Sequence, residues 1–251
     1  MLLEHKNAVI YGGGGLVGGA VARAFAREGA RVHLAGRTLA KLDRVAADIR
    51  AAGGTAQAAE VDALDEQAVN RFVDDVAARA GSVDISFNVI SSRDVQGTPL
   101  VELSVGDFLQ PITTVLRSHF LTGRAAARHM IGQGSGVILA FGGSGGGTVV
   151  PNLGGFQVAL EALEAFRRQL ACEVGPRGVR VVTLQTGGVA ETIPEGYEGR
   201  EELVASLVEP TLLKRTATLE DVGNVAAFVA SDKARTMTAT GVNITCGAIV
   251  D

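Results

Sequence analysis

A glycine-rich run near the start of the chain has the composition of a phosphate-binding loop. Residues 11–20 read Tyr-Gly-Gly-Gly-Gly-Leu-Val-Gly-Gly-Ala, after a short apolar segment and before an amphipathic helical pattern. Glycines let the backbone turn sharply and approach a pyrophosphate, whose charge is stabilised by the N–H groups at the start of the next helix. In this setting the run predicts a dinucleotide site rather than a flexible turn. The predicted contacts come from Gly12, Gly14, Gly15, Leu16, Val17 and Gly18.

Two charged residues after later strand patterns indicate which dinucleotide is bound. The second pattern ends Leu-Ala-Gly-Arg at Arg37, where a protein that prefers NAD usually carries a carboxylate for the ribose 2′-hydroxyl. Arg37 offers a planar cation to a 2′-phosphate, so NADP(H) is favoured; the alternative is a solvated residue at a helix start. Asp62 and Ala63 follow the third pattern, where the Asp62 carboxylate could accept from the adenine amino group. The alternative role for Asp62 is the N-cap of the next helix.

The elements that must position these residues alternate between strands and helices. Short apolar runs, typical of strands buried on both faces, lie at 8–11, 32–35, 55–61, 83–89, 137–141, 179–184 and 242–246. Helical patterns lie between them at 17–29, 38–52, 65–80, 104–131, 155–174 and 219–231. The alternation predicts an α/β fold, one doubly wound Rossmann-type domain over residues 1–251 with helices on both faces of a parallel sheet. An irregular insertion around 187–212 is predicted to act as a substrate lid.

Composition and charge argue against several other classes of protein. The chain has 251 residues and a formal net charge of −4, so it offers no general attraction to nucleic acid or to anionic lipid. The apolar runs are of strand length and the start shows no signal-peptide pattern, which predicts a cytoplasmic protein without a membrane partner. Cys172, Cys246 and the four histidines lack ligand spacing, so we expect neither a metal site nor a disulfide.

The chain resembles the short-chain dehydrogenase/reductase family from Lys6 to its C-terminus. The resemblance is carried by the glycine loop, by Ala-Gly-Arg at 35–37, by Val-Asp at 61–62, and by the segments 170–181 and 228–232. It implies a seven-stranded sheet, a nicotinamide cofactor across the carboxyl ends of the strands, and a homodimer or homotetramer built on the long fourth and fifth helices. It also implies cofactor contacts from Asn88, Val89, Thr186, Gly187 and Val189.

The positions that are catalytic in this family carry other residues here. By alignment to the segment 170–181, the tyrosine and lysine of the family fall on Phe156 and Leu160. Its serine falls on Gly143 and its helix asparagine on Val115. Because the two tyrosines and four lysines of the chain all lie outside the helix at 155–174, no small register error restores the pair. The usual proton relay through tyrosine and lysine is therefore excluded.

Four polar residues are the candidate replacements for this relay. They are Ser144, Gln157, His119 and Tyr197. Ser144 could donate to a substrate oxygen, although a serine among glycines is as typical of a turn. Gln157 could donate likewise or cap a neighbouring backbone group. For His119 the alternative is a buried or interface histidine, and for Tyr197 a surface aromatic on the lid.

These features favour an NADPH-dependent oxidoreductase with a non-standard active site. Hydride transfer belongs to the nicotinamide, so such a site can still reduce an activated C=N, C=C or C=O bond of a small apolar substrate. The first alternative is a binding module, an NADP(H)-holding pseudoenzyme or sensor with the same fold. A further alternative is a non-redox isomerase or cyclase that uses the same pocket.

Overall fold

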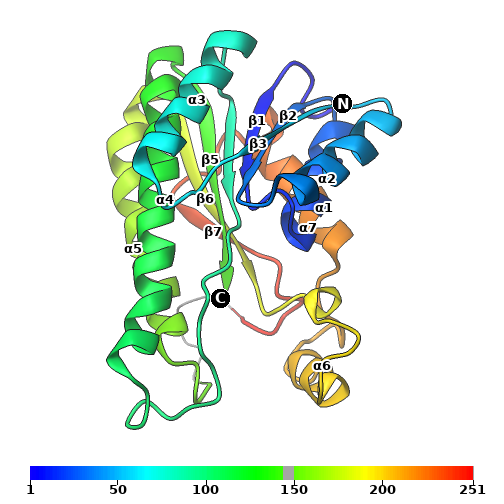
Figure 1. Ribbon diagram of the computed structural model, residues 1–251, viewed down its shortest axis with the longest axis vertical. Helices are drawn as coiled ribbons and strands as arrows, with labels where there is room; N and C mark the ends of the chain where they lie inside the picture. The colour runs from blue at the N-terminus through cyan, green and yellow to red at the C-terminus, as the bar shows by residue number, and fades with distance from the viewer. Residues whose placement is uncertain (144–149, 251) are drawn as a thin grey trace.

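The computed structural model describes residues 1–143 and 150–250, whose strands form a parallel seven-stranded sheet. The strand order is β3-β2-β1-β4-β5-β6-β7 (Figure 1). The strands are β1 (Asn7–Tyr11), β2 (Arg31–Gly36), β3 (Thr55–Glu60), β4 (Ile85–Asn88), β5 (Gly136–Gly143), β6 (Val179–Thr186) and β7 (Thr240–Asn243). This sheet confirms the predicted doubly wound α/β fold.

Helices cover both faces of the sheet, as βαβ connections require. Helices α1, α2 and α7 pack on one face, and α3, α4 and α5 pack on the other (Figure 1). Their bounds are α1 (Leu16–Arg27), α2 (Leu39–Ala51), α3 (Glu66–Ala80), α4 (Val105–Gln133), α5 (Gly155–Val174), α6 (Arg200–Val208) and α7 (Leu219–Ala230). Short 3-10 helices are η1 (Gly175–Arg177), η2 (Ala190–Thr192) and η3 (Asp232–Ala234). The segment expected to be a lid thus contains η2 and α6.

The apolar face of α1 shows how the sequence pattern becomes packing. Val21 and Phe25, one turn apart, are fully buried in the cluster that also contains Ile10 of β1 and Leu34 of β2. Burial of a phenylalanine side chain stabilises a fold by about 1.5–3 kcal/mol relative to exposure. This contact holds α1 across β1 and β2.

The strand order reverses direction between β1 and β4. From β1 the chain builds outward through β2 to β3, and then returns to start β4 on the other side of β1. At the carboxyl end of β1, Tyr11 is in register with Ala35 of β2 and with Asn88 of β4. In doubly wound sheets the loops diverge at such a point and leave a crevice that binds ligands.

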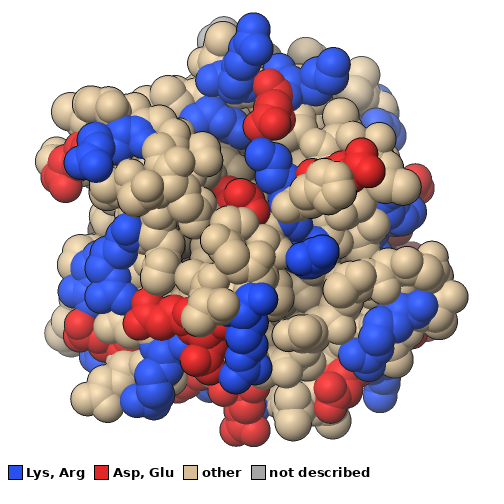
Figure 2. Space-filling model, turned by 90° about the horizontal axis from the view of Figure 1, so that it is seen from above, with Lys and Arg blue, Asp and Glu red and all other residues tan. Residues whose placement is uncertain are grey.

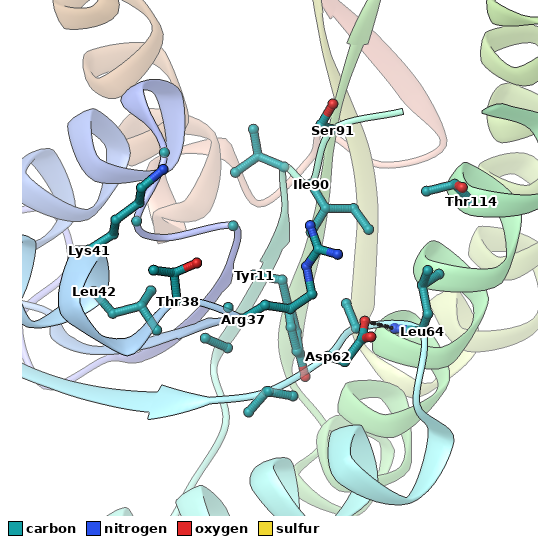
Figure 3. Close-up of a pocket in the computed structure, with 18 of the residues that line it drawn as sticks. Tyr11, Arg37, Thr38, Lys41, Leu42, Asp62, Leu64, Ile90, Ser91 and Thr114 are labelled. Carbon is teal, nitrogen blue, oxygen red and sulfur yellow. Dashed lines mark hydrogen bonds between the residues drawn. The ribbon is translucent and has the colours of Figure 1, made fainter. Parts of the chain in front are cut away.

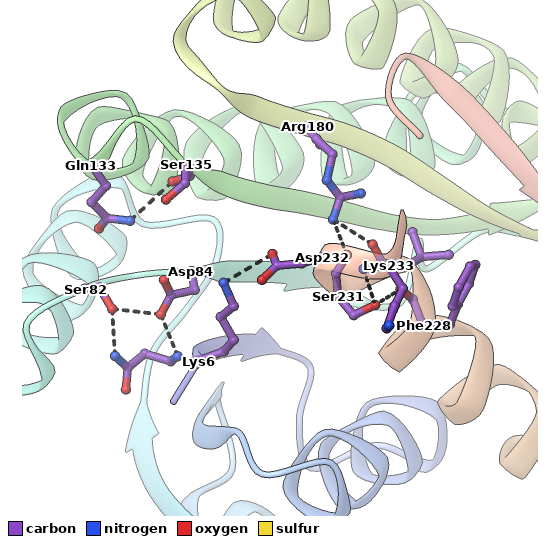
Figure 4. Close-up of polar contacts among 12 residues, drawn as sticks. Lys6, Ser82, Asp84, Gln133, Ser135, Arg180, Phe228, Ser231, Asp232 and Lys233 are labelled. Atoms are coloured by element: carbon purple, nitrogen blue, oxygen red, sulfur yellow. Dashed lines mark hydrogen bonds and ion pairs between the residues drawn. The ribbon is translucent and has the colours of Figure 1, made fainter. Parts of the chain in front are cut away.

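Polar contacts tie the amino ends of the strands together (Figure 4). The Asp84 carboxylate accepts from the Asn7 backbone N–H at 2.8 Å and from the Ser82 hydroxyl at 2.7 Å. Arg180 of β6 donates to the carbonyl oxygens of Val229, at 2.8 Å, and Ser231, at 3.2 Å. The loops at this end of the sheet are thus engaged in structural hydrogen bonds.

The last strand begins and ends earlier than the apolar run 242–246 predicts. It ends at Asn243 because side-chain hydrogen bonds turn the backbone there. The Asn243 side-chain oxygen accepts from the Thr245 backbone N–H at 3.0 Å and from the Thr245 hydroxyl at 2.8 Å. Such local bonds compete with strand pairing. Cys246 then adopts a φ of 57°, outside the strand region.

On the face seen from above, basic and acidic side chains are interspersed (Figure 2). Over residues 1–143 and 150–250, none of the helices combines the length and the hydropathy needed to cross a membrane.

Candidate nucleotide and active site

A pocket of about 370 Å³ lies at the carboxyl ends of the strands beside the β1–β4 switch point. Its walls come from the glycine loop, the end of β2, the turn after β3 and the loop after β4 (Figure 3). The predicted cofactor contacts Gly12, Gly14, Gly15, Arg37, Asp62, Ala63 and Val89 all line it. Four loops that are distant in the sequence therefore meet where the predicted dinucleotide site requires them.

Close backbone packing makes glycine necessary in the loop. Gly12 has a φ of +80°, and a Cβ there would be 2.8 Å from the Val89 carbonyl oxygen. A Cβ on Gly18, in the first turn of α1, would collide with the Gly12 carbonyl oxygen. The N-cap of α1 is Gly15, which has no side chain to accept from the first-turn N–H groups. Such a helix start fits a bound pyrophosphate.

Two further predicted contacts from the loop lie beside the pocket rather than in its lining. The Leu16 side chain is 57% exposed at the start of α1, and Val17 is partly buried against the core.

Asn88, the predicted contact at the end of β4, is buried. Its amide donates to the Thr122 hydroxyl at 3.1 Å, and its oxygen accepts from the Ile90 N–H at 3.1 Å. Asn88 therefore holds the backbone of the loop after β4 in place through its hydrogen bond with Ile90.

Two cations stand at the end of β2, where the sequence predicted one. Arg37 extends across the pocket, and Lys41 projects from the first turn of α2 (Figure 3). Gly14 lies against Lys41, since a Cβ on Gly14 would be 3.0 Å from Lys41 Cβ. Thr38, the N-cap of α2, also lines the pocket, and in the described part of the chain its hydroxyl makes no capping hydrogen bond. Sequence reasoning missed Lys41, although its spacing of four from Arg37 places it at the start of the following helix.

Asp62 lines the pocket and is not the N-cap of α3. Its carboxylate accepts from the Leu64 backbone N–H at 3.0 Å and lines the pocket. The N-cap of α3 is instead Asp65, which accepts from the Ala68 N–H at 3.0 Å. That hydrogen bond holds the pKa of Asp65 below its ordinary value. The alternative role of Asp62 as the helix cap is therefore wrong.

The phenol of Tyr11 lies beneath the pocket. The residue is 1% exposed, and within residues 1–143 and 150–250 its hydroxyl has no hydrogen-bond partner. Its ring packs edge-on against Phe72 at a centroid distance of 6.0 Å. Burial raises the pKa of Tyr11 far above its ordinary value, so the phenol stays neutral.

The positions that we predicted to align with the family's catalytic residues carry apolar side chains or glycine. Leu160 and Val115 are buried, at 5% and 6% exposure, and Phe156 is half-buried at the start of α5. Gly143, at the end of β5, faces Leu160 so closely that a Cβ there would be 3.0 Å from Leu160 Cδ1. A side chain at 143 would therefore press on this methyl group of Leu160.

The predicted proton donors that lie in the described residues, Gln157, Tyr197 and His119, do not line the nucleotide pocket. Ser144 lies outside the described residues. Gln157 is half-buried in the first turn of α5. Tyr197 is 53% exposed in the turn before α6.

His119 points into a separate small cavity of about 10 Å³, which Arg167 of α5 also lines. Its Nδ1 lies 2.9 Å from the Val115 carbonyl oxygen, and since a carbonyl can only accept, Nδ1 carries the proton. Burial lowers the pKa of His119 to about 4, so the ring is neutral at pH 7. The structure therefore places His119 among buried residues, away from the nucleotide pocket.

The contacts predicted at the end of β6 lie apart from the pocket lining. Thr186 and Val189 are buried, whereas Gly187 is exposed beside Thr245 and Ala248. They belong to the loop that leads to η2, on the β7 side of the sheet. Their part in binding a cofactor stays a prediction.

Comparison with known proteins agrees with this architecture. A family model described as "Enoyl-(Acyl carrier protein) reductase" matches residues 16–248. A probable galactose dehydrogenase of Rhizobium meliloti is 30% identical over 241 residues, which cover 94% of this chain and 92% of that protein. A 7alpha-hydroxysteroid dehydrogenase of Clostridium sardiniense is 28% identical over 235 residues, covering 92% and 88%. A solved structure of a short-chain dehydrogenase/reductase from Serratia marcescens has a TM-score of 0.87 at 26% identity, over 99% of each chain. The chain therefore belongs to the short-chain dehydrogenase/reductase family of oxidoreductases, which bind a nicotinamide cofactor.

Proposed function

We propose that the protein is an NADPH-dependent reductase that acts on an activated C=N, C=C or C=O bond of a small apolar substrate. The observation that carries the cofactor preference is the pair of cations Arg37 and Lys41 at one end of the pocket. Gly36, the last residue of β2, precedes this pair and brings no carboxylate that would repel a phosphate. A guanidinium and an ammonium together suit the double charge of a 2′-phosphate.

The rest of the pocket fits the remaining parts of the cofactor. The loop at Gly12, Gly14 and Gly15, with the start of α1, supports a pyrophosphate. The Asp62 carboxylate supports an adenine amino group. We place Thr186, Gly187 and Val189 beside the carboxamide of the nicotinamide, which supplies a hydride when bound.

The apolar character of the aligned catalytic positions supports the choice of acceptor. With Phe156 and Leu160 in place of a phenol and an ammonium, a developing alkoxide would lie in a low-dielectric site without an acid. An iminium ion avoids this cost, because accepting hydride neutralises its charge. Ser144 and Gln157 are the donors that we propose for weaker polarisation, and Tyr197 would join them if the segment 187–212 closes over the substrate.

A screen of NADPH oxidation over cyclic imines, enones and plain ketones, run beside a calorimetric titration with NADPH, tests the proposal. Turnover of imines or enones well above that of ketones is expected. Tight NADPH binding without hydride transfer to any acceptor would instead favour an NADP(H)-binding protein without catalytic activity. Absence of NADPH binding would contradict both functions.

A further inference from the structure

A third cation lines the nucleotide pocket from the wall opposite Arg37 and Lys41. Arg93 belongs to the loop after β4, across the switch point from β2 and α2. Its position in the chain, five residues beyond β4, showed no pattern that predicts a site. The pocket therefore has positive side chains on two walls.

The loop holds Arg93 in an unusual backbone conformation. Its φ of 57° is in the left-handed region, which non-glycine residues seldom occupy. The Arg93 backbone N–H donates to the Ser91 hydroxyl at 3.3 Å, which secures the turn. Strained backbone of this kind occurs often at ligand-binding positions, where the gain on binding offsets its cost.

Neighbouring acidic groups leave the guanidinium of Arg93 available. Asp94, the next residue, is engaged by the Ser92 hydroxyl and by the Gln96 amide. Over residues 1–143 and 150–250, no carboxylate lies within ion-pair distance of Arg93, and the same holds for Arg37 and Lys41.

The charge balance of the pocket favours a polyanion. Among the described residues, its charged lining side chains are three cations and the single carboxylate of Asp62, which already accepts from the Leu64 N–H. Like charges on facing walls repel each other until an anion binds between them. The glycine loop supports the pyrophosphate, so the cations are left for another phosphate.

The direction of Arg37 indicates which phosphate this is. Its guanidinium reaches across the pocket toward Ile90, three residues before Arg93 (Figure 3). An anion bound by Arg37 would therefore lie beside the loop that carries Arg93. We propose that Arg93 binds the cofactor's 2′-phosphate from the opposite wall, so that Arg37, Lys41 and Arg93 form a two-sided clamp. This inference rests on the proposed preference for NADPH.

Two nucleotides separate the phosphates in a calorimetric test. Adenosine 2′,5′-bisphosphate carries the 2′-phosphate without a pyrophosphate, whereas ADP carries the pyrophosphate alone. The test variant is Arg93→Asn, because asparagine tolerates the left-handed backbone while removing the charge. Arg93→Lys retains the charge. Arg44→Met is the matched control, since Arg44 is an exposed cation on α2 outside the pocket lining.

Arg93→Asn is expected to weaken the bisphosphate by about tenfold and ADP by less than about twofold. Arg93→Lys should keep most of the affinity, and Arg44→Met should change neither ligand. An equal loss for both nucleotides, or a loss for neither, overturns the clamp. If Arg37→Ala weakens the bisphosphate while Arg93→Asn leaves its affinity unchanged, the clamp fails and the NADPH preference stands. Equal binding of NADPH and NADH by the unmodified protein would overturn the preference and the clamp together.

Discussion

Leu160 of α5 lies directly over Gly143 at the end of β5. A Cβ built on Gly143 would be 3.0 Å from Leu160 Cδ1, and one on Gly142 would be 3.2 Å from Leu160 Cδ2. The absence of a side chain at 143 and the presence of leucine at 160 are therefore coupled by packing. A side chain introduced at 143 therefore requires Leu160 to give way by a few tenths of an ångström or to be shortened.

Gly143→Ser should lower the free energy of unfolding by about 1–3 kcal/mol, because the new Cβ overpacks the buried Leu160. Leu160→Ala alone should cost about 2–5 kcal/mol through the cavity it leaves. The double variant should lose less than the two single losses combined, by at least about 0.5 kcal/mol. Urea unfolding of all three variants measures this coupling. Gly132→Ser is the control, since a Cβ there meets nothing within 4 Å. If the losses of the two single variants add up to the loss of the double variant, the contact between positions 143 and 160 does not affect stability.

NADP(H) should bind at least about tenfold more tightly than NAD(H), which corresponds to about 1.4 kcal/mol. Arg37→Ala should remove most of this difference, and Lys41→Ala should reduce it, because both side chains line the pocket at the end of β2. Titration of NADPH and NADH by fluorescence or calorimetry provides the measurement. Equal affinities in the unmodified protein would contradict the assignment of Arg37.

Reduction should be faster for iminium ions and conjugated alkenes than for plain ketones. Gln157→Leu should slow imine reduction by less than about tenfold, since an iminium ion needs little proton assistance. The combined change Gly143→Ser, Phe156→Tyr and Leu160→Lys should introduce ketone reduction, whereas Gly143→Ser alone should not. Rapid ketone reduction by the unmodified protein would reveal a proton donor other than Ser144, Gln157, His119 and Tyr197.

The protein should form a homodimer or homotetramer through α4 and α5. Phe120 on α4 is 47% exposed and Val158 on α5 is 43% exposed, so both helices carry apolar side chains on their outer faces. Symmetric packing would bury these groups. Light scattering at micromolar concentration should give a dimer or larger mass, and Phe120→Asp should reduce it. A monomer in the unmodified protein would refute this assembly.

Stability should fall on acidification because of His119. Its pKa is about 4 in the fold and 6.5 ordinarily, so the unfolded chain takes up a proton that the folded protein excludes. Stability from the neutral ring is complete above pH 6.5 and is lost as the pH falls from there toward 4. The loss between pH 7 and pH 5 should be about 2 kcal/mol.

His119→Gln should flatten this part of the pH profile when unfolding by urea is followed at several pH values. His5→Gln is the control, because the His5 side chain is 88% exposed. If both variants keep the slope of the unmodified protein, His119 is not its source.

The sequence by itself determined the features that depend on neighbours in the chain. Alternation of apolar runs and helical patterns is local, so it predicted the doubly wound sheet. The glycine loop before α1, Arg37 after β2 and the lack of tyrosine and lysine in α5 can likewise be read from spacing alone. Each of these follows from backbone geometry or residue type at a single place in the chain.

Contacts between distant segments were decided only by the tertiary structure. Lys41 and Arg93, far apart in the chain, line one pocket because β1 separates β2 from β4 at the switch point. His119 turns into a cavity beside Arg167 because of the way α4 packs on α5, which helical periodicity does not specify. The contact of Leu160 with Gly143 depends in the same way on where α5 crosses β5. Helix packing and strand order arise from the summed burial of many side chains, so no local pattern contains them.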